Sequence, residues 1–92
     1  MNKKKLLFIV NVDWFFVSHR LAIAKEALSQ GYEVHIATSV TNKLNLLIKN
    51  GLIVHDLGLN RGRANFSFIS ELLNFHSIIK AINPDLVHLV TI

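Results

Sequence analysis

Several residue types are missing or scarce, and each scarcity excludes a class of protein. The 92 residues include no cysteine, one proline and four glycines. A chain without cysteine has no disulfide framework and no thiolate ligands for a metal. No apolar run approaches the ~20 residues of a membrane-spanning helix. The apolar start is cut short by Asn11 and Asp13 and lacks a small-residue cleavage site, unlike a signal peptide. These absences predict a cytoplasmic protein.

Common nucleotide and metal motifs are also missing. There is no G-x-G-x-x-G fingerprint and no P-loop, so a typical NAD-dependent enzyme is not expected. The five histidines are His19, His35, His55, His76 and His88. They show neither H-x-H nor H-E-x-x-H spacing, so we expect no metal site and no cofactor. Three of them lie in expected strands, where a hydrogen-bonded structural histidine is the common case, and the one at position 76 is expected at the surface.

Charged residues are few but mainly basic. Lysine and arginine number ten against six acidic residues, which gives a formal charge of +4. This balance permits a nucleic acid, an anionic membrane or a phosphorylated substrate as partner. Because no basic stripe is interleaved with aromatics, nucleic acid is not expected. Lys3, Lys4 and Lys5 are either a solubilising flank or a contact with the inner face of the cell membrane.

Apolar residues, 51% of the chain, follow an alternating pattern of strands and helices. Strands are predicted at Leu6–Val12, Val34–Thr38, Leu52–Leu57 and Leu86–Ile92. A first helix opens at Ser18 and ends before Gly31; a second covers 44–50 and a third 68–82. Continuous apolar strands that alternate with helices predict a parallel sheet of the α/β class. Right-handed crossovers make it Rossmann-like, β-α-β-α-β-α-β, with strand order 3-2-1-4.

The last seven residues, LVHLVTI, form an apolar run without a turn or cap. We therefore expect residues 1–92 to be an incomplete N-terminal domain. Its partly uncovered last strand predicts marginal stability or self-association.

Candidate binding residues gather at the carboxyl ends of the predicted strands, where such sheets bind ligands. Asp13 and Trp14 follow the first strand, and Ser18, His19 and Arg20 come next. With serine as N-cap, the free N–H groups of a helix start would attract an anion beside the two basic side chains. The alternative is a capped helix with solvated polar residues. The aromatics there either belong to the core or meet a sugar or lipid.

A second anion signal lies in the polar loop GLNRGRANFS. Its Arg61 and Arg63 carry guanidinium groups that match phosphate oxygens, and Gly58 and Gly62 let the loop bend around a ligand. The alternative is that both are solvated loop charges.

Two segments, DWFFVSHRL and PDLVHLVT, resemble the N-terminal domain of GT-B glycosyltransferases of family 4, and the likeness covers essentially the whole chain in order. The nearest likeness is to bacterial enzymes that build O-antigen, capsule or other polyprenyl-linked glycans. The resemblance implies a retaining hexosyl- or N-acetylhexosaminyl-transferase of two Rossmann-like domains. The N-terminal domain holds the acceptor; the C-terminal domain, which carries an E-x7-E motif absent here, grips the nucleotide-sugar.

Several expectations follow from the resemblance. The acceptor is a glycan or polyprenyl diphosphate, no metal is needed, and the fragment alone is inactive. Many members carry a glycine pair in the first loop, where this chain has DWFFVSHR. No catalytic acid or base is assigned. The competing hypothesis is a stand-alone flavodoxin-like binding or signalling module.

Overall fold

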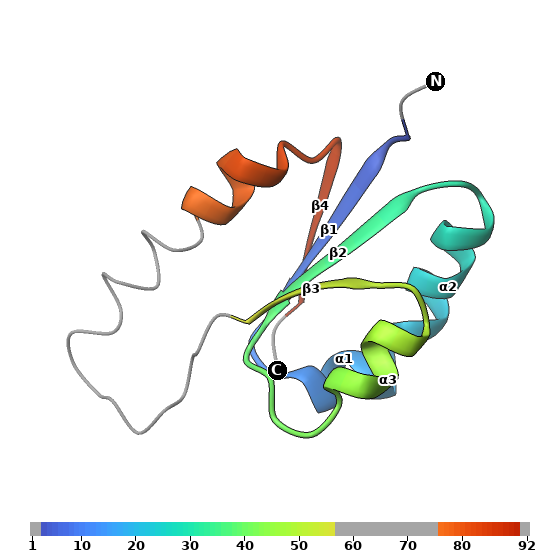
Figure 1. The fold of residues 1–92 in the computed structure, drawn as a ribbon, viewed down its shortest axis with the longest axis vertical. Helices are drawn as coiled ribbons and strands as arrows, with labels where there is room; N and C mark the ends of the chain where they lie inside the picture. Colours follow the sequence, from blue (N-terminus) through green and yellow to red (C-terminus); the bar gives the residue numbers. More distant parts are fainter. Residues whose placement is uncertain (1–2, 57–75, 91–92) are drawn as a thin grey trace.

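The computed structural model describes residues 3–56 and 76–90 of the chain (Figure 1). The elements along the chain are β1 Lys5–Val10, α1 Asp13–His19, α2 Leu21–Ser29, β2 Glu33–Thr38, α3 Leu44–Lys49, β3 Ile53–Asp56, a helical segment at 76–82, and β4 Leu86–Val90.

The four strands form one parallel sheet in the order β3-β2-β1-β4. β1 is central: its Leu6 pairs with Val34 of β2 on one side and with Leu86 of β4 on the other. The predicted α/β class, Rossmann-like topology and 3-2-1-4 order are therefore confirmed. All carboxyl ends meet at one edge of the sheet.

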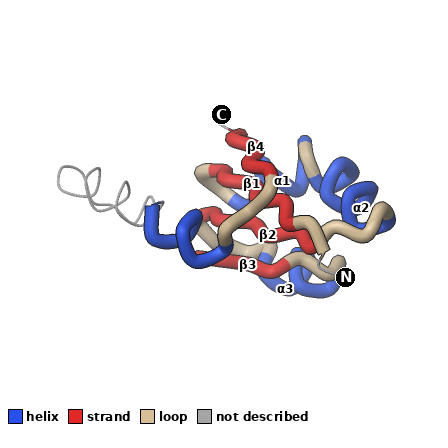
Figure 2. Tube along the Cα trace, turned by 90° about the horizontal axis from the view of Figure 1, so that it is seen from above, coloured by secondary structure: helices blue, strands red, loops and turns tan. Residues whose placement is uncertain are grey.

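Helices cover both faces of the sheet, and Figure 2 shows α2 and the 76–82 segment on opposite sides of it. Successive residues of a strand point to opposite faces, and residues 6–10 of β1 are all apolar because both faces are covered. Phe8 and Val10 pack with Phe16 of α1 on one face. Leu7 and Ile9 pack with Ala37 and Ile82 on the other face. The apolar run of β1 thus supplies two cores.

The first helix differs from the sequence prediction. The chain becomes helical at Asp13, not Ser18, and it breaks at Arg20 into α1 and α2. Arg20 has φ −129° and ψ −6°, which interrupts regular helical geometry. Strand β1 ends at Val10, so the apolar Val12 precedes the helix rather than extending the strand. The aromatics expected in a turn are the first turn of α1.

The two helix-ending glycines behave as the sequence predicts. Gly31 follows α2 with φ +94°, and Gly51 follows α3 with φ +90°. These left-handed angles favour glycine because a Cβ would be strained there. The last described helix ends at Ile82, before Pro84, also as expected. The predicted loop 58–67, the first part of the third helix (68–75) and the last two residues lie outside the described residues.

Candidate functional site

The candidate site lies at the carboxyl ends of β1 and β2. α1 begins three residues after β1, and residues 39–43 connect β2 to α3. Ligands of parallel α/β sheets bind outside these strand ends, near the point where the strand order reverses. Here that point is β1, which lies between β2 and β4. The start of α1 and the 39–43 connection therefore form the rim of the expected binding region.

Asp13 joins the two parts of this rim. Its backbone N–H donates to the Ser39 carbonyl at 3.1 Å. Its carboxylate accepts from the Thr41 hydroxyl at 2.6 Å, and from the backbone N–H groups of Thr41 and Lys43, both at 2.9 Å. The residue is completely buried. The buried carboxylate of Asp13 thus holds the start of α1 against the 39–43 connection. A direct contact between Asp13 and a ligand stays a prediction.

The environment of Asp13 keeps its carboxyl ionised. Burial alone would raise the pKa, because it penalises the charged form. The hydrogen bonds from Thr41, Lys43 and the Trp14 backbone favour the carboxylate and outweigh burial, so the pKa lies below its usual value. Asp13 thus links α1 to the 39–43 connection through a negative charge that the surrounding N–H groups stabilise. We call this arrangement the Asp13 clamp.

The three consecutive aromatics have three different surroundings. Phe16 is fully buried and packs edge-on against Phe8, with ring centroids 5.0 Å apart. Phe15 is partly buried and stacks on the His19 ring at 4.2 Å. Trp14 is 47% exposed and meets the Phe15 ring edge-on. One aromatic thus belongs to the core, while the Trp14 indole and the Phe15–His19 stack form an aromatic surface on α1.

Ser18 does not cap a helix, contrary to the prediction; Arg20 is the N-cap of α2, without a side-chain cap. Ser18 is inside α1 and no side chain caps that helix; the N-cap position is Val12. His19 ends α1, where the helix dipole favours a cation rather than an anion. The prediction misplaced the helix start because the first strand was drawn two residues too long.

The basic side chains of this segment are held by local contacts. The Nδ1 atom of His19 lies 3.1 Å from the Phe15 carbonyl, so a proton on Nδ1 would be donated to it. The Arg20 guanidinium donates from Nη1 to the His19 carbonyl at 3.0 Å. Its buried Nε has no hydrogen-bond partner in the described part of the chain. These two basic side chains, His19 and Arg20, lie at the C-terminal end of α1. The whole length of that helix separates them from its start. Arg61 and Arg63 lie outside the described residues.

A second polar cluster, on the sheet face that packs against 76–82, escaped the sequence analysis as a group. His35 and His55 were each expected to be hydrogen-bonded structural histidines. They bond to one another, Nδ1 of His35 to Nε2 of His55 at 2.9 Å, and His35 also meets Glu33. The register of β2 and β3 explains this contact, because it places both histidines on the same face of neighbouring parallel strands. Expectations were also stated for two further histidines: His88 packs against the Phe8 ring, and His76 is exposed.

In residues 3–56 and 76–90, no group of three or more histidine, aspartate or glutamate side chains is arranged to hold a metal ion. No helix there combines the length and apolar character needed to cross a membrane.

Comparison with protein-family models identifies a family that matches this chain. The family is described as glycosyl transferase 4-like, and the match covers residues 5–92, nearly the entire chain. Searches of curated proteins and of solved structures each return no significant match.

Proposed function

Because the chain belongs to the glycosyltransferase 4-like family, we propose that it forms the acceptor-side domain of a retaining glycosyltransferase. The proposed reaction moves a hexosyl or N-acetylhexosaminyl group from a nucleotide-sugar to a glycan or polyprenyl-linked acceptor. The process served would be synthesis of a cell-surface polysaccharide such as O-antigen or capsule. A second, C-terminal domain would hold the nucleotide-sugar.

The family match over residues 5–92 carries the proposal. The parallel sheet in the order β3-β2-β1-β4 agrees with it, because this architecture directs ligands to the carboxyl ends of the strands. The same match argues against the alternative of a flavodoxin-like signalling module.

The exposed aromatic surface of α1 suits the proposed acceptor. The Trp14 indole offers an apolar face and one N–H donor. A sugar ring presents an apolar face with hydroxyls at its edge, and a prenyl chain is wholly apolar, so either packs on an indole. Trp14 and the Phe15–His19 stack would then contact the acceptor, with Asp13 holding the rim behind them.

Basic groups would bind the anionic part of the reactants. We assign this role to His19 and Arg20, with Arg61 and Arg63 as further candidates and Ser18 as a hydroxyl donor. Donors fixed around a departing diphosphate stabilise its charge, so the reaction would not require a metal. No residue is assigned as catalytic acid or base.

Tryptophan fluorescence provides a direct test, because Trp14 is the sole tryptophan of the sequence. We expect a saturable change when the chain is titrated with a short-chain prenyl diphosphate-linked N-acetylglucosamine, and none with UDP-N-acetylglucosamine. His19→Ala should weaken acceptor binding about tenfold, the value of one charge-assisted contact. Ser29→Ala, an exposed substitution on α2, is the matched control and should leave the affinity unchanged.

Three results would contradict the proposal. A response to the nucleotide-sugar alone would place the donor in this domain. Saturable binding of flavin mononucleotide without acceptor binding would favour the flavodoxin-like alternative. Sugar transfer by the 92-residue chain alone would refute the division of roles between two domains.

A further inference from the structure

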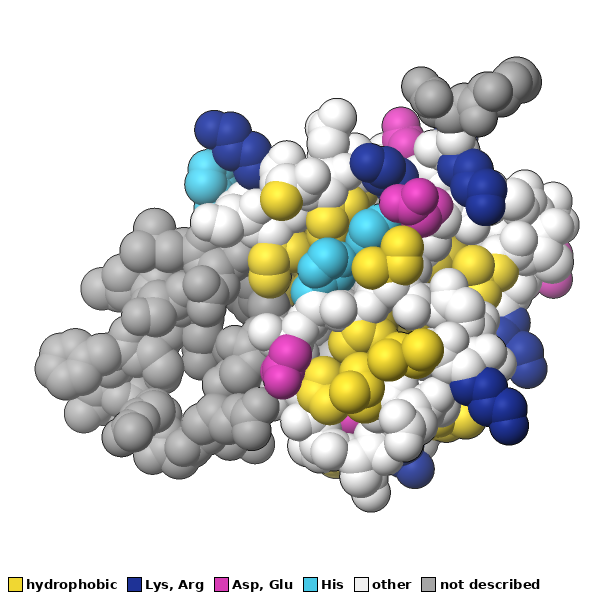
Figure 3. Space-filling view, viewed as in Figure 1, with side chains coloured by type: hydrophobic (Ala, Val, Ile, Leu, Met, Phe, Trp, Pro, Cys, Tyr) yellow, Lys and Arg dark blue, Asp and Glu magenta, His cyan; other side chains and the backbone are white. Residues whose placement is uncertain are grey.

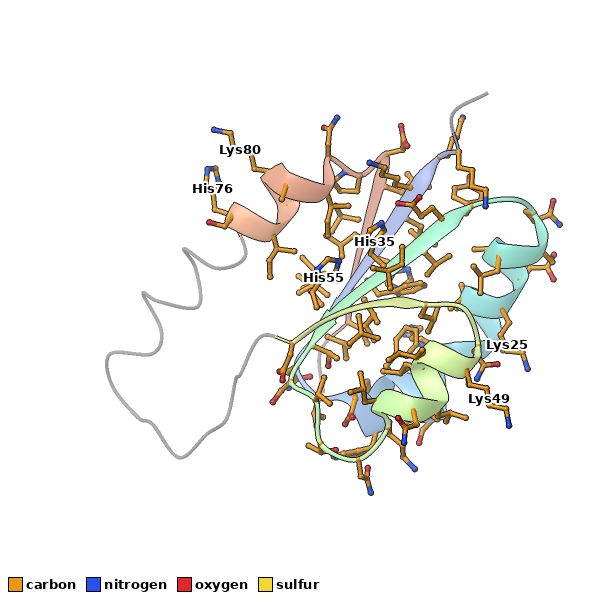
Figure 4. The ribbon with its side chains drawn as sticks, in the orientation of Figure 1. Lys25, His35, Lys49, His55, His76 and Lys80 are labelled. Atoms are coloured by element: carbon orange, nitrogen blue, oxygen red, sulfur yellow. The ribbon has the colours of Figure 1, made fainter. Side chains whose placement is uncertain are left out.

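Three titratable side chains form a hydrogen-bonded chain away from the proposed binding region. The Nε2 atom of His35 lies 2.6 Å from the Glu33 carboxylate, and its Nδ1 lies 2.9 Å from Nε2 of His55. Glu33 and His35 belong to β2, and His55 belongs to β3. We call these residues the histidine relay. Figure 4 shows both rings between β2, β3 and the 76–82 segment.

The two rings meet head-on. Their planes differ by 17° and their centroids are 5.2 Å apart. This is the separation of two imidazoles whose nitrogens face each other across 2.9 Å in a shared plane. Each lone pair or N–H therefore points directly at the other ring. Such an arrangement makes a good N–H···N hydrogen bond and does not converge on a metal ion.

The geometry limits how many protons the relay can hold. With Glu33 ionised, His35 donates from Nε2 to the carboxylate, and the neutral His55 donates from Nε2 to Nδ1 of His35. One extra proton is tolerated, because an N–H of one ring can still face a lone pair of the other. When both rings are protonated, two N–H groups face each other and the bond is lost.

Other charges around the relay are few. On β1, Lys5 pairs in register with Glu33 while its ammonium donates to the Ile82 carbonyl at 3.0 Å; its charge and that of Lys3 help to lower the pKa of Glu33. On β3, Asp56 comes next in the chain and therefore points to the opposite face. On the 76–82 segment, His76 and Lys80 are exposed and point away from the relay (Figure 4). Among the described residues, Glu33 is the carboxylate that can compensate a charge on the rings.

Strand β3 depends on few other contacts. It has four residues and pairs with β2 alone in the described part of the chain. Val54 is its member that packs against the main core, while Ile53 is 43% exposed. The histidine bond therefore adds a side-chain link to the four backbone register pairs that join β3 to β2. Figure 3 shows histidine side chains among apolar ones on this face of the molecule, where His35 is only 7% exposed and His55 is partly buried.

We propose that the histidine relay is a pH-sensitive latch on β3. It holds the edge strand against β2 while the two rings share at most one extra proton, and it opens when both rings are protonated.

The direction of the pH effect follows from His55. Burial, followed by the charge of His35, lowers the pKa of His55 below its ordinary value of 6.5. Its contribution to stability is therefore complete above pH 6.5 and is lost as the pH falls toward the lowered pKa. The hydrogen bond from His35 lowers the pKa of Glu33, whose contribution is lost only below its ordinary value of 4.5. Between pH 5 and 7.5 the change at the relay therefore comes from its histidines rather than from Glu33.

Amide hydrogen exchange of β3 tests the latch. Opening should take up one proton, so its equilibrium constant should rise by up to about tenfold per pH unit below pH 6.5. His55→Gln places a side-chain amide N–H where His55 donates. Unlike an imidazole, this amide does not take up a proton in this pH range. We expect this variant to keep the protection of β3 at pH 7.5 and to lose its pH dependence. His76→Gln removes a histidine outside the relay and should leave the pH dependence unchanged.

A second measurement does not need a folded variant. In uniformly nitrogen-15-labelled protein at pH 7.5, a scalar coupling through the hydrogen bond should join Nδ1 of His35 to Nε2 of His55. It should disappear as the pH falls and the protection factors of the β3 amides, corrected for the intrinsic exchange rate, decrease. Absence of the coupling at pH 7.5 would overturn the proposal, as would equal pH dependence in wild type and His55→Gln.

Discussion

At the residue scale, Asp13 connects parts of the chain that the sequence separates widely. Its carboxylate receives hydrogen bonds from Thr41 and Lys43, which lie 28 and 30 positions away. The sequence placed Asp13 correctly beyond the carboxyl end of the first strand, although that strand ends at Val10 rather than at Val12. It could not reveal whether the carboxylate faces a ligand or the protein, because that depends on the path of the 39–43 connection. The same applies to Trp14 and Phe16, which differ in exposure though they lie in one turn of α1.

Asp13→Asn tests the clamp. The amide would turn an NH2 group toward backbone donors and leave at least one of them buried without a partner. We expect a loss of about 2–4 kcal/mol in the free energy of unfolding at pH 7, measured with urea. The pKa of Asp13 is lowered, so its contribution is present above the ordinary value of 3.8 and is lost as the pH falls further. The difference between the two proteins should therefore shrink below about pH 4.

Asp85→Asn is the matched control for this prediction. Asp85 also accepts a backbone hydrogen bond, from Lys5 at 2.8 Å, but it is exposed. We expect a cost below about 1 kcal/mol for this substitution. Equal effects of the two substitutions would show that the burial of the Asp13 clamp contributes nothing.

At the element scale, the sequence predicts the strands better than the first helix. Continuous apolar runs identify the strands, and the handedness of crossovers fixes their order. The start of α1 was missed because Val12 and the aromatics that follow Asp13 are weak helix formers, so the apolar pattern looked like strand and turn. Tertiary packing of Phe16 against Phe8 overrides that weak local preference. The relay between His35 and His55 was likewise hidden, because the sequence predicted that these two strands pair but not their register.

Strand β4 carries the strongest element-level prediction. Leu86, Val87 and Leu89 are 53%, 48% and 68% exposed, and in the described residues β4 pairs with β1 alone. An exposed apolar edge strand pairs readily with another chain. We expect the 92-residue chain to associate reversibly in sedimentation velocity as its concentration rises. Leu89→Lys should reduce this association with little change in melting temperature, because an exposed side chain contributes little to the core.

Ile48→Lys provides the control for β4. Ile48 is 56% exposed on α3, which lies beside β3 at the opposite edge of the sheet from β4, so the substitution adds the same charge elsewhere. It should leave the association unchanged. A chain that stays monomeric at all concentrations would refute the prediction. Equal effects of the two lysines would show that association depends on net charge rather than on β4.

At the scale of the whole molecule, the distribution of charge leads to a further prediction. The formal charge is +4, and the structure separates the N-terminal lysines into two kinds. Lys3 and Lys4 are exposed, whereas Lys5 is partly buried with its ammonium on the Ile82 carbonyl. The proposed contact with an anionic membrane therefore rests on two lysines rather than three.

The membrane contact is tested with vesicles that contain phosphatidylglycerol. Each lysine near an anionic surface contributes about 1 kcal/mol, so replacing Lys3 and Lys4 by glutamine should weaken binding roughly 30-fold. Added salt should weaken the wild-type interaction, because it screens exposed charges. Lys25 and Lys49 lie on α2 and α3, far from the N-terminus in Figure 4, and replacing both by glutamine removes the same net charge. That control should bind as the wild type does. Equal losses in the two double variants would indicate nonspecific attraction, and unchanged binding without Lys3 and Lys4 would make them a solubilising flank.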